Sequence, residues 1–435
     1  MGNNSVNHTT TLHKDETKTF RRVLCKSCNL LCSTLYKKLE TQKSSFERGT
    51  VGWFFKIFFL IGFLFAALPA QAQLSDIVDV GGYFKELGQV SFDNNISTFR
   101  YDNSLQNRLE TNWTFSDDFE FRADLRTRFI SGYSIENTPG ITEFYETDSG
   151  FADATWVWFD TDRSVLQSQI DRFYASYYSG DFEVHAGRQR INWARTFVWS
   201  PNDLFNNYAF LDFDYEERPG VDALLAQYNW SFGSSVQVGY RAADSFKQSV
   251  VAGMVRTNWG SYDIQLLGGH YQDQIAVGGG WAGYLKSAGF KGELTYFQPQ
   301  DNFLDDPGTL TATVGFDYML PNSLYLRSEL LYNGGFEQGR SPLADLNRPP
   351  SANDLFIAET GLFLSGDYPV TPLLNASLSM MSSFDRSLFI FIPQLRYSIS
   401  KDLDLLVLSQ LLKGNTFTER LETPNLFFFS LKWSY

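Results

Sequence analysis

The last ten residues of the chain alternate strictly between two kinds of side chain. On one parity they are apolar or aromatic: Phe427, Phe429, Leu431, Trp433 and Tyr435. On the other parity they are small or charged: Ser430, Lys432 and Ser434. Only a β-strand has a period of two, so only a strand places these two sets on opposite faces. A face that stays apolar and aromatic up to the final residue is typical of a strand that crosses a bilayer and ends at its interface. An edge strand of a soluble β-sandwich would show the same alternation.

The clearest alternation in the interior of the chain lies at residues 118–129. Five charged side chains share one parity: Glu120, Arg122, Asp124, Arg126 and Arg128. The opposite parity is apolar: Phe119, Phe121, Ala123, Leu125 and Phe129. Burying so many charges in a dry core is prohibitive, so the charged face is expected to meet water.

Eighteen such runs follow one another, and every second connection between them is short. The runs are residues 78–91, 99–114, 118–130, 165–178, 181–192, 219–231, 234–243, 247–259, 261–270, 273–287, 289–298, 308–319, 322–333, 354–365, 371–382, 386–398, 402–413 and 425–435. The predicted short turns include Gly260, Lys401-Asp402 and residues 366–369. Short turns at one rim and long loops at the other indicate an all-β, transmembrane antiparallel β-barrel of about 18 strands without a plug domain. Sixteen strands is the alternative count. The C-terminal strand resembles that of bacterial outer-membrane barrels.

Residues 53–68 are almost continuously apolar and are followed by Ala70-Gln71-Ala72. An apolar run before a small-x-small site is the pattern of a signal peptide. The alternative, a transmembrane anchor, needs about 20 apolar residues, and this run is shorter. We therefore expect residues 1–72 to be a removed leader and residues 73–435 to be the barrel.

All three cysteines, Cys25, Cys28 and Cys32, lie in this expected leader. The remaining chain would have no disulfide and no thiolate metal site. It would keep two histidines, His185 and His270, and it has no glycine loop of the kind that holds phosphates. We expect it to need no metal or nucleotide cofactor.

The expected leader contains more basic than acidic residues, so its removal makes the rest of the chain more acidic. Ten of the 36 basic residues and four of the 49 acidic residues lie in it, which leaves 26 basic and 45 acidic residues and a formal charge of −19. Nucleic-acid phosphates need a basic surface, so a nucleic-acid partner is excluded.

Four arginines are expected to share the inner wall of the barrel: Arg108, Arg122, Arg126 and Arg128. Acidic and amide side chains alternate with them, so the inner wall is predicted to be polar, charged and mixed in sign. The arginines can brace the wall through cross-strand ion pairs. They can also guide a polar or anionic solute, because rings of arginine and lysine favour anions.

The run from His185 to Trp193 breaks the alternation. Phe182, Val184 and Ala186 are expected to face lipid, and the same parity would place Arg188 and Arg190 in lipid at about 2–4 kcal/mol each. A β-bulge near Gly187 would turn both arginines into the barrel.

This run belongs to a motif made of Gly187-Arg188-Gln189, Asn192-Trp193 and Pro201-Asn202-Asp203. The motif resembles one found in the alginate-export and related porin-like families of outer-membrane channels. The resemblance implies an eighteen-stranded diffusion channel for an anionic or polar solute, with arginines in the conduit. This chain is more acidic than that pattern, which leaves an anionic polymer as the substrate open.

The predicted loop at residues 194–218 is rich in aromatic and acidic residues, among them Trp199, Asp203 and Tyr208. Folding into the barrel would bury the rings and narrow the pore. The alternative is an extracellular cap or an aromatic cluster at the rim.

The sequence thus predicts an outer-membrane porin, a passive channel for small polar or anionic solutes, including oligosaccharides, with outer-membrane lipid around it. The candidate pore-lining residues are Arg108, Arg122, Arg126, Arg128, Arg188, Arg190, Trp199, Asp203 and Tyr208. The alternatives are a barrel hydrolase and a structural or adhesin barrel. A hydrolase needs a nucleophile and a base at one depth, and neither histidine has a readable set of partners in the sequence. We therefore do not expect an enzyme. The oligomeric state stays open.

Overall fold

The computed structural model describes residues 77–92, 99–148, 150–207, 211, 212, 214, 218–301, 303, 305–337, 350–384, 388–414 and 425–435. The expected leader, residues 1–72, lies outside this part of the chain. So does Tyr208.

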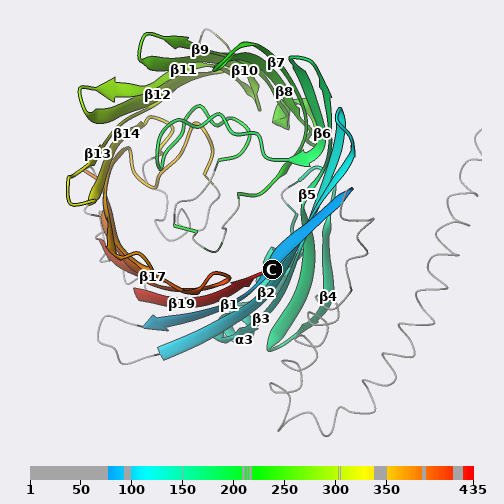
Figure 1. The fold of residues 1–435 in the computed structure, drawn as a ribbon, viewed down its shortest axis with the longest axis vertical. Helices are drawn as coiled ribbons and strands as arrows, with labels where there is room; N and C mark the ends of the chain where they lie inside the picture. Colours follow the sequence, from blue (N-terminus) through cyan, green and yellow to red (C-terminus); the bar gives the residue numbers. More distant parts are fainter. Residues whose placement is uncertain are drawn as a thin grey trace, which may run out of the picture. The chain divides into compact units, whose positions relative to one another are not determined.

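Nineteen strands form one antiparallel sheet that curves into a ring (Figure 1). The strands are β1 (Val78–Phe92), β2 (Phe99–Ser116), β3 (Phe119–Gly132), β4 (Thr155–Thr161), β5 (Ser164–Ser179), β6 (Phe182–Gln189), β7 (Val221–Ser231), β8 (Ser234–Arg241), β9 (Val250–Trp259), β10 (Tyr262–Tyr271), β11 (Gln274–Leu285), β12 (Ala288–Pro299), β13 (Thr309–Met319), β14 (Tyr325–Asn333), β15 (Thr360–Thr371), β16 (Leu374–Ser382), β17 (Leu388–Ser400), β18 (Leu403–Gly414) and β19 (Asn425–Ser434). Short helices complete the described elements: α3 (Tyr133–Asn137), α4 (Ile141–Glu146) and η1 (Phe246–Gln248).

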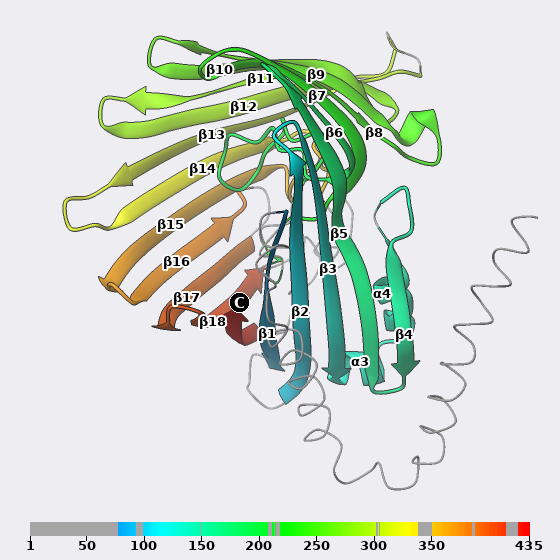
Figure 2. The same cartoon turned by 45° about the vertical axis from the view of Figure 1, so that its right-hand side comes forward.

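The ring closes through the first and last strands. β1 pairs with β2 on one side and with β19 on the other. β3 pairs directly with β5, and β4 adds to the first half of β5 as an extra strand (Figure 2). Eighteen strands therefore close the barrel, as the sequence predicted, and the alternative of sixteen strands is wrong. Closure leaves no strand edge without partners in hydrocarbon.

Two predicted boundaries between strands are wrong. The turn expected at residues 366–369 lies inside β15, which continues to Thr371. Pro369 is accommodated there because the register of β15 with β16 shifts between Pro369 and Thr371, so the missing N–H falls at an irregularity. The strand expected to begin at residue 354 begins at Thr360 instead.

The outer face of the ring is apolar. Side chains such as Phe173, Leu266 and Val277 alternate along the strands with inward ones and are largely exposed. At the end of β19 the rings of Trp433 and Tyr435 lie against Phe84 of β1, with centroids 6.0 and 5.6 Å away. Aromatic rows of this kind are typical of the interface zone of a membrane barrel. Among the described residues, no helix is long and apolar enough to span a membrane.

Two connections fold into the ring instead of out of it (Figure 1). They are the described residues of the range 190–220, here called the inward loop, and residues 350–359, which precede β15. The prediction that the loop after β6 folds inward is confirmed for its described residues. Its side chains donate to inner-wall residues of β8 and β10, and its backbone N–H groups donate to inner-wall residues of β12 and β14.

The prediction of a uniformly polar inner wall is wrong for part of the ring. The inner faces of β15 to β19 carry buried apolar side chains: Phe363, Met381, Ile390, Leu408 and Phe428. Trp199 of the inward loop and Phe356 of the second inward segment pack on these side chains, and the ring centroids of Trp199 and Phe356 lie 5.1 Å from each other. The inward segments therefore share a hydrophobic core with this part of the wall.

Candidate functional site

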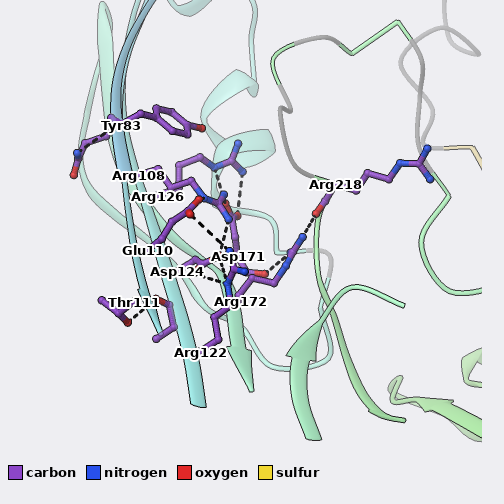
Figure 3. A network of polar contacts seen from close by, with 12 residues as sticks. Tyr83, Arg108, Glu110, Thr111, Arg122, Asp124, Arg126, Asp171, Arg172 and Arg218 are labelled. Atoms are coloured by element: carbon purple, nitrogen blue, oxygen red, sulfur yellow. Dashed lines mark hydrogen bonds and ion pairs between the residues drawn. The ribbon is translucent and has the colours of Figure 1, made fainter. Parts of the chain in front are cut away.

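Pairing of β2 with β3 brings the four arginines of the predicted cluster together, here called the arginine wall (Arg108, Arg122, Arg126 and Arg128). Arg108 lies directly opposite Arg126, and Arg122 lies on the same face of β3 (Figure 3). The register places Arg128 on that face as well. Like charges at such positions repel, so anions must lie between them.

Those anions come from the wall itself. Arg108 pairs with Asp124 at 2.9 Å and with Asp171, while Arg126 pairs with Asp171 at 3.2 Å. Both arginines are 2% exposed. Arg108 also pairs with Glu110 at 2.7 Å. Buried pairs that share partners in this way brace the wall, and they leave these two guanidinium groups little surface for a solute.

Asp171 reaches this network through an irregularity in β5. The register of β3 with β5 shifts between Asp124 and Leu125, so Asp171 has no partner residue on β3. Asp171 and Arg172 consequently both contact the inner network, although neighbours in a regular strand point to opposite faces. A strict period of two places only Arg172 on the inner face, because alternation alone cannot indicate a bulge.

The other two arginines of the wall are more open. The Arg122 side chain is 28% exposed and pairs with Asp124 at 2.9 Å and with Glu110 at 3.7 Å. Arg128 lies over the ring of Tyr145 in α4, 5.8 Å from its centroid. These two are the members of the arginine wall best placed to meet a solute.

Arg188 has a different environment. β6 pairs regularly with β5 and β7 through Gly187, so the predicted bulge is wrong. Arg188 is instead covered by Asp148 and by residues 150–154. All five of its N–H groups have acceptors: both oxygens of Asp222, one of Asp148, and the carbonyls of Ile170 and Ala152. Arginine has five donors and no more.

This arrangement closes a gap in the wall. β6 leaves the sheet after Gln189, so the first half of β5 would have an open edge. β4 pairs with that edge, and Arg188 ties the preceding segment, at Asp148 and Ala152, to the ends of β6 and β7. We call this junction the seam. Gly150 is required within it, because a Cβ there would lie 2.0 Å from the Arg188 guanidinium. Arg190, just beyond β6, is exposed and near Asp203.

The first part of the inward loop, residues 191–206, is here called the inner lobe. Its backbone N–H groups donate hydrogen bonds to two carboxylates of the wall. Glu293 of β12 accepts from the N–H groups of Arg195, Thr196 and Asn202, and Glu329 of β14 accepts from those of Phe197, Val198 and Trp199. Both glutamates are 1% exposed. Strand alternation places both glutamates on the inner wall but gives no signal for this role.

The two predicted residues of the inner lobe are both buried. The ring of Trp199 fills the space over Gly361, where a Cβ would lie 2.9 Å from it. Asp203 pairs with Arg218 at 3.2 Å. Burial raises the pKa of Asp203 to about 7, against the opposing effect of Arg218. Neither side chain offers a free surface to a solute.

The far part of the inward loop reaches the opposite side of the ring. Asp214 accepts from Lys85 of β1 at 3.1 Å and from Gln106 of β2 at 2.8 Å. Burial would raise the pKa of Asp214, but Lys85 together with Arg128 and Arg126 holds it below its usual range. The loop thus places a negative charge beside the arginine wall.

His185 has partners that the sequence did not reveal. Its Nδ1 lies 2.7 Å from Ser176 Oγ, and its Nε2 lies 3.6 Å from Glu183. The three resemble a hydrolase set, but Ser176 is 4% exposed and the strands that carry it pair on both sides. The strand N–H groups are then engaged and cannot stabilise an oxyanion. In the described residues no three His, Cys, Asp or Glu side chains form a metal-binding group.

A closed ring of eighteen antiparallel strands, apolar outside and with a loop folded inside, defines a porin-type barrel of the bacterial outer membrane. Comparison with solved structures finds the same fold. OccAB2 of Acinetobacter baumannii matches with a TM-score of 0.55 and 11% identity over 83% of this chain and 98% of that one. OccK3 (OpdO) of Pseudomonas aeruginosa matches with a TM-score of 0.52 and 11% identity over 83% of this chain and 97% of that one. The outer membrane protein opdK of Pseudomonas aeruginosa matches with a TM-score of 0.51 and 10% identity over 82% of this chain and 98% of that one.

At these identities the likeness shows the fold alone. No protein-family model matches the chain, and no curated protein matches it. The resemblance to the alginate-export channels is therefore not supported at the level of the family.

Proposed function

We propose that the protein is a passive diffusion channel of the outer membrane for small polar or anionic solutes, including oligosaccharides. The observation that carries this proposal is the inward loop, which spans the interior of a closed barrel from Glu293 and Glu329 on one side to Lys85 on the other. A loop in that position narrows the conduit and brings any solute close to the arginine wall.

The charges on the two sides of this narrowing support a polar solute. Arg122 and Arg128 lie on the wall, and Asp212 and Asp214 lie on the loop that faces it. Such a transverse field orients dipolar and charged molecules. Because acids accompany the basic groups, we expect a modest preference for anions. The motif of Gly187-Arg188-Gln189, Asn192-Trp193 and Pro201-Asn202-Asp203 contributes the start of the loop, at Trp193, and its buried acid, at Asp203, so we propose that the motif builds this constriction.

Replacing Arg122 and Arg128 together with alanine is expected to lower the preference for anions over cations. A unit charge 4–8 Å from an ion in water contributes about 0.5–1 kcal/mol, so each arginine should change the permeability ratio roughly two- to fivefold. The reversal potential in planar bilayers under a salt gradient measures this ratio. The effect should weaken as salt increases, since screening acts over about 8 Å at 0.15 M.

Arg163 provides the matched control, because its side chain is 84% exposed and lies 3.7 Å from Glu136, outside the arginine wall. Arg163→Ala should leave the permeability ratio unchanged. An unchanged ratio in the double variant, accompanied by a less stable barrel, would assign Arg122 and Arg128 to bracing.

A further inference from the structure

Two glutamates of the barrel wall hold the inner lobe by its backbone. Glu293 also accepts the Ser200 hydroxyl at 2.6 Å, and Glu329 bonds three successive N–H groups. The nearby guanidinium group of Arg195 donates to Gln265 at 2.9 Å. The donors to the two glutamates are thus N–H and hydroxyl groups of one loop.

A third carboxyl, Asp203, is buried in the same lobe and is 0% exposed. The charged and titratable groups that act on it come from every element around it: Arg190, Arg218, Tyr271 and Glu293. Glu293 is in turn close enough to Glu329 to repel it. Three acidic groups therefore lie between the lobe and the wall, and Arg218 is the basic partner that pairs with one of them.

We propose that Asp203, Glu293 and Glu329 position the inner lobe and thereby set the width of the channel, and that protonation of this cluster makes the position dependent on pH. The proposal rests on the channel function proposed above. It treats the three carboxyls as positioning residues, since they act through the lobe and not on the solute.

The direction of the pH effect follows from burial. In the seated lobe Asp203 is out of water, whereas in a released lobe it is hydrated and has an ordinary pKa. Its pKa in the seated state is raised to about 7. A group whose pKa is higher in one state stabilises that state at low pH, and this stabilisation is lost as the pH rises through the higher value. Acid therefore favours the seated lobe, and raising the pH from the ordinary carboxyl pKa to about 7 favours its release.

The backbone bonds oppose this release at any pH. Carboxylates accept hydrogen bonds at both oxygens, whereas the glutamine amide would present an NH₂ group to some of the loop N–H donors. Glu329→Gln and Glu293→Gln are therefore expected to loosen the lobe over the whole pH range. Asp203→Asn, which imitates the neutral acid, is expected to keep the lobe seated and to remove the pH dependence.

The test combines two measurements on the full-length barrel. Single-channel conductance is recorded from pH 5 to pH 9, and hydrogen exchange of the amides at residues 196–202 is measured over the same range after correction for intrinsic rates. Between pH 5 and pH 7 the ratio of released to seated lobe should rise about tenfold per pH unit in the unmodified protein, and above pH 7 it should level off, because Asp203 is then ionised in both states. Conductance should become larger and noisier in parallel. Asp203→Asn should flatten both profiles.

Asp301→Asn is the matched control, because Asp301 is 76% exposed and pairs with Lys247 at 2.7 Å. It should leave both profiles unchanged. Retention of the full pH dependence in Asp203→Asn overturns the proposal, as does pH-independent exchange in the unmodified protein. If the barrel folds but conducts no ions, the channel function fails, while hydrogen exchange still tests the positioning role. The exchange of the unmodified protein decides the matter even where a glutamate variant does not fold.

Discussion

Deletion of residues 433–435 is expected to abolish assembly of the barrel. Tyr435 exchanges two backbone hydrogen bonds with Gly82, at 3.0 and 3.1 Å, and its hydroxyl donates to the Arg108 carbonyl at 3.1 Å. The deletion removes these contacts and the aromatic row on Phe84, and it leaves the first part of β1 without a partner on that side. Each unpaired backbone group in hydrocarbon costs several kcal/mol. Leaving the groups of only a few residues unpaired therefore costs more than the free energy of unfolding of most proteins, about 5–15 kcal/mol.

The measurement is the amount of heat-modifiable protein in the outer-membrane fraction. This amount should fall more than about tenfold, because each loss of about 1.4 kcal/mol in the free energy of assembly reduces it tenfold. Tyr435→Phe is the matched control, since it removes the hydroxyl and keeps the ring and the backbone bonds. It should assemble at close to the normal level. A truncated chain that shows the normal band shift would contradict the requirement for a complete closing pair of strands.

The fold could be predicted from the sequence wherever the period of two is undisturbed. Along β3 the charged residues from Glu120 to Arg128 do face the interior, and Phe427, Leu431 and Trp433 of β19 do face outward. Membrane strands are easily recognised in this way, because one face meets lipid and the other meets water or polar groups, so apolar and polar residues must alternate along the strand.

The candidate site could be predicted less well, because its key contacts depend on departures from that period. Asp171 reaches the arginine wall through a register shift that leaves no mark in composition. Residues 355–358 are continuously apolar and were expected to lie in a strand. They fold inward instead, because the Asn333 side chain bonds the carbonyls of Phe356 and Ala358 at 2.8 and 3.1 Å.

The error at Gly187 has an instructive cause. The sequence indicated that Arg188 could not lie in lipid, which is correct, and a bulge was the local way to avoid it. The chain avoids it at long range instead, by bringing Asp148 to the arginine from another connection. Contacts between residues 40 positions apart cannot be read from alternation.

Replacing Arg188 with alanine is accordingly expected to destabilise the barrel rather than to change its selectivity. The substitution leaves Asp148, which is 4% exposed, and Asp222 beside one another without their common cation. Removing one partner of a buried ion pair typically costs about 3–5 kcal/mol. The temperature at which the folded band converts to the unfolded band should fall, and the reversal potential under a salt gradient should stay the same.

The chemistry of the seam predicts how other substitutions rank. Arg188→Lys keeps the charge but loses the planar fork that serves two carboxylates and two carbonyls, so it should be intermediate. Asp222→Asn in the Arg188→Ala background should recover part of the loss, because it removes one of the two uncompensated charges. Burial would raise the pKa of Asp148, but the hydrogen bond from Arg188 holds this pKa below its ordinary value. The seam should therefore weaken as the pH falls from the ordinary aspartate pKa to the lowered pKa of Asp148. A variant at Arg188 that melts normally but loses its preference for anions would instead place this arginine in the conduit, as the sequence first suggested.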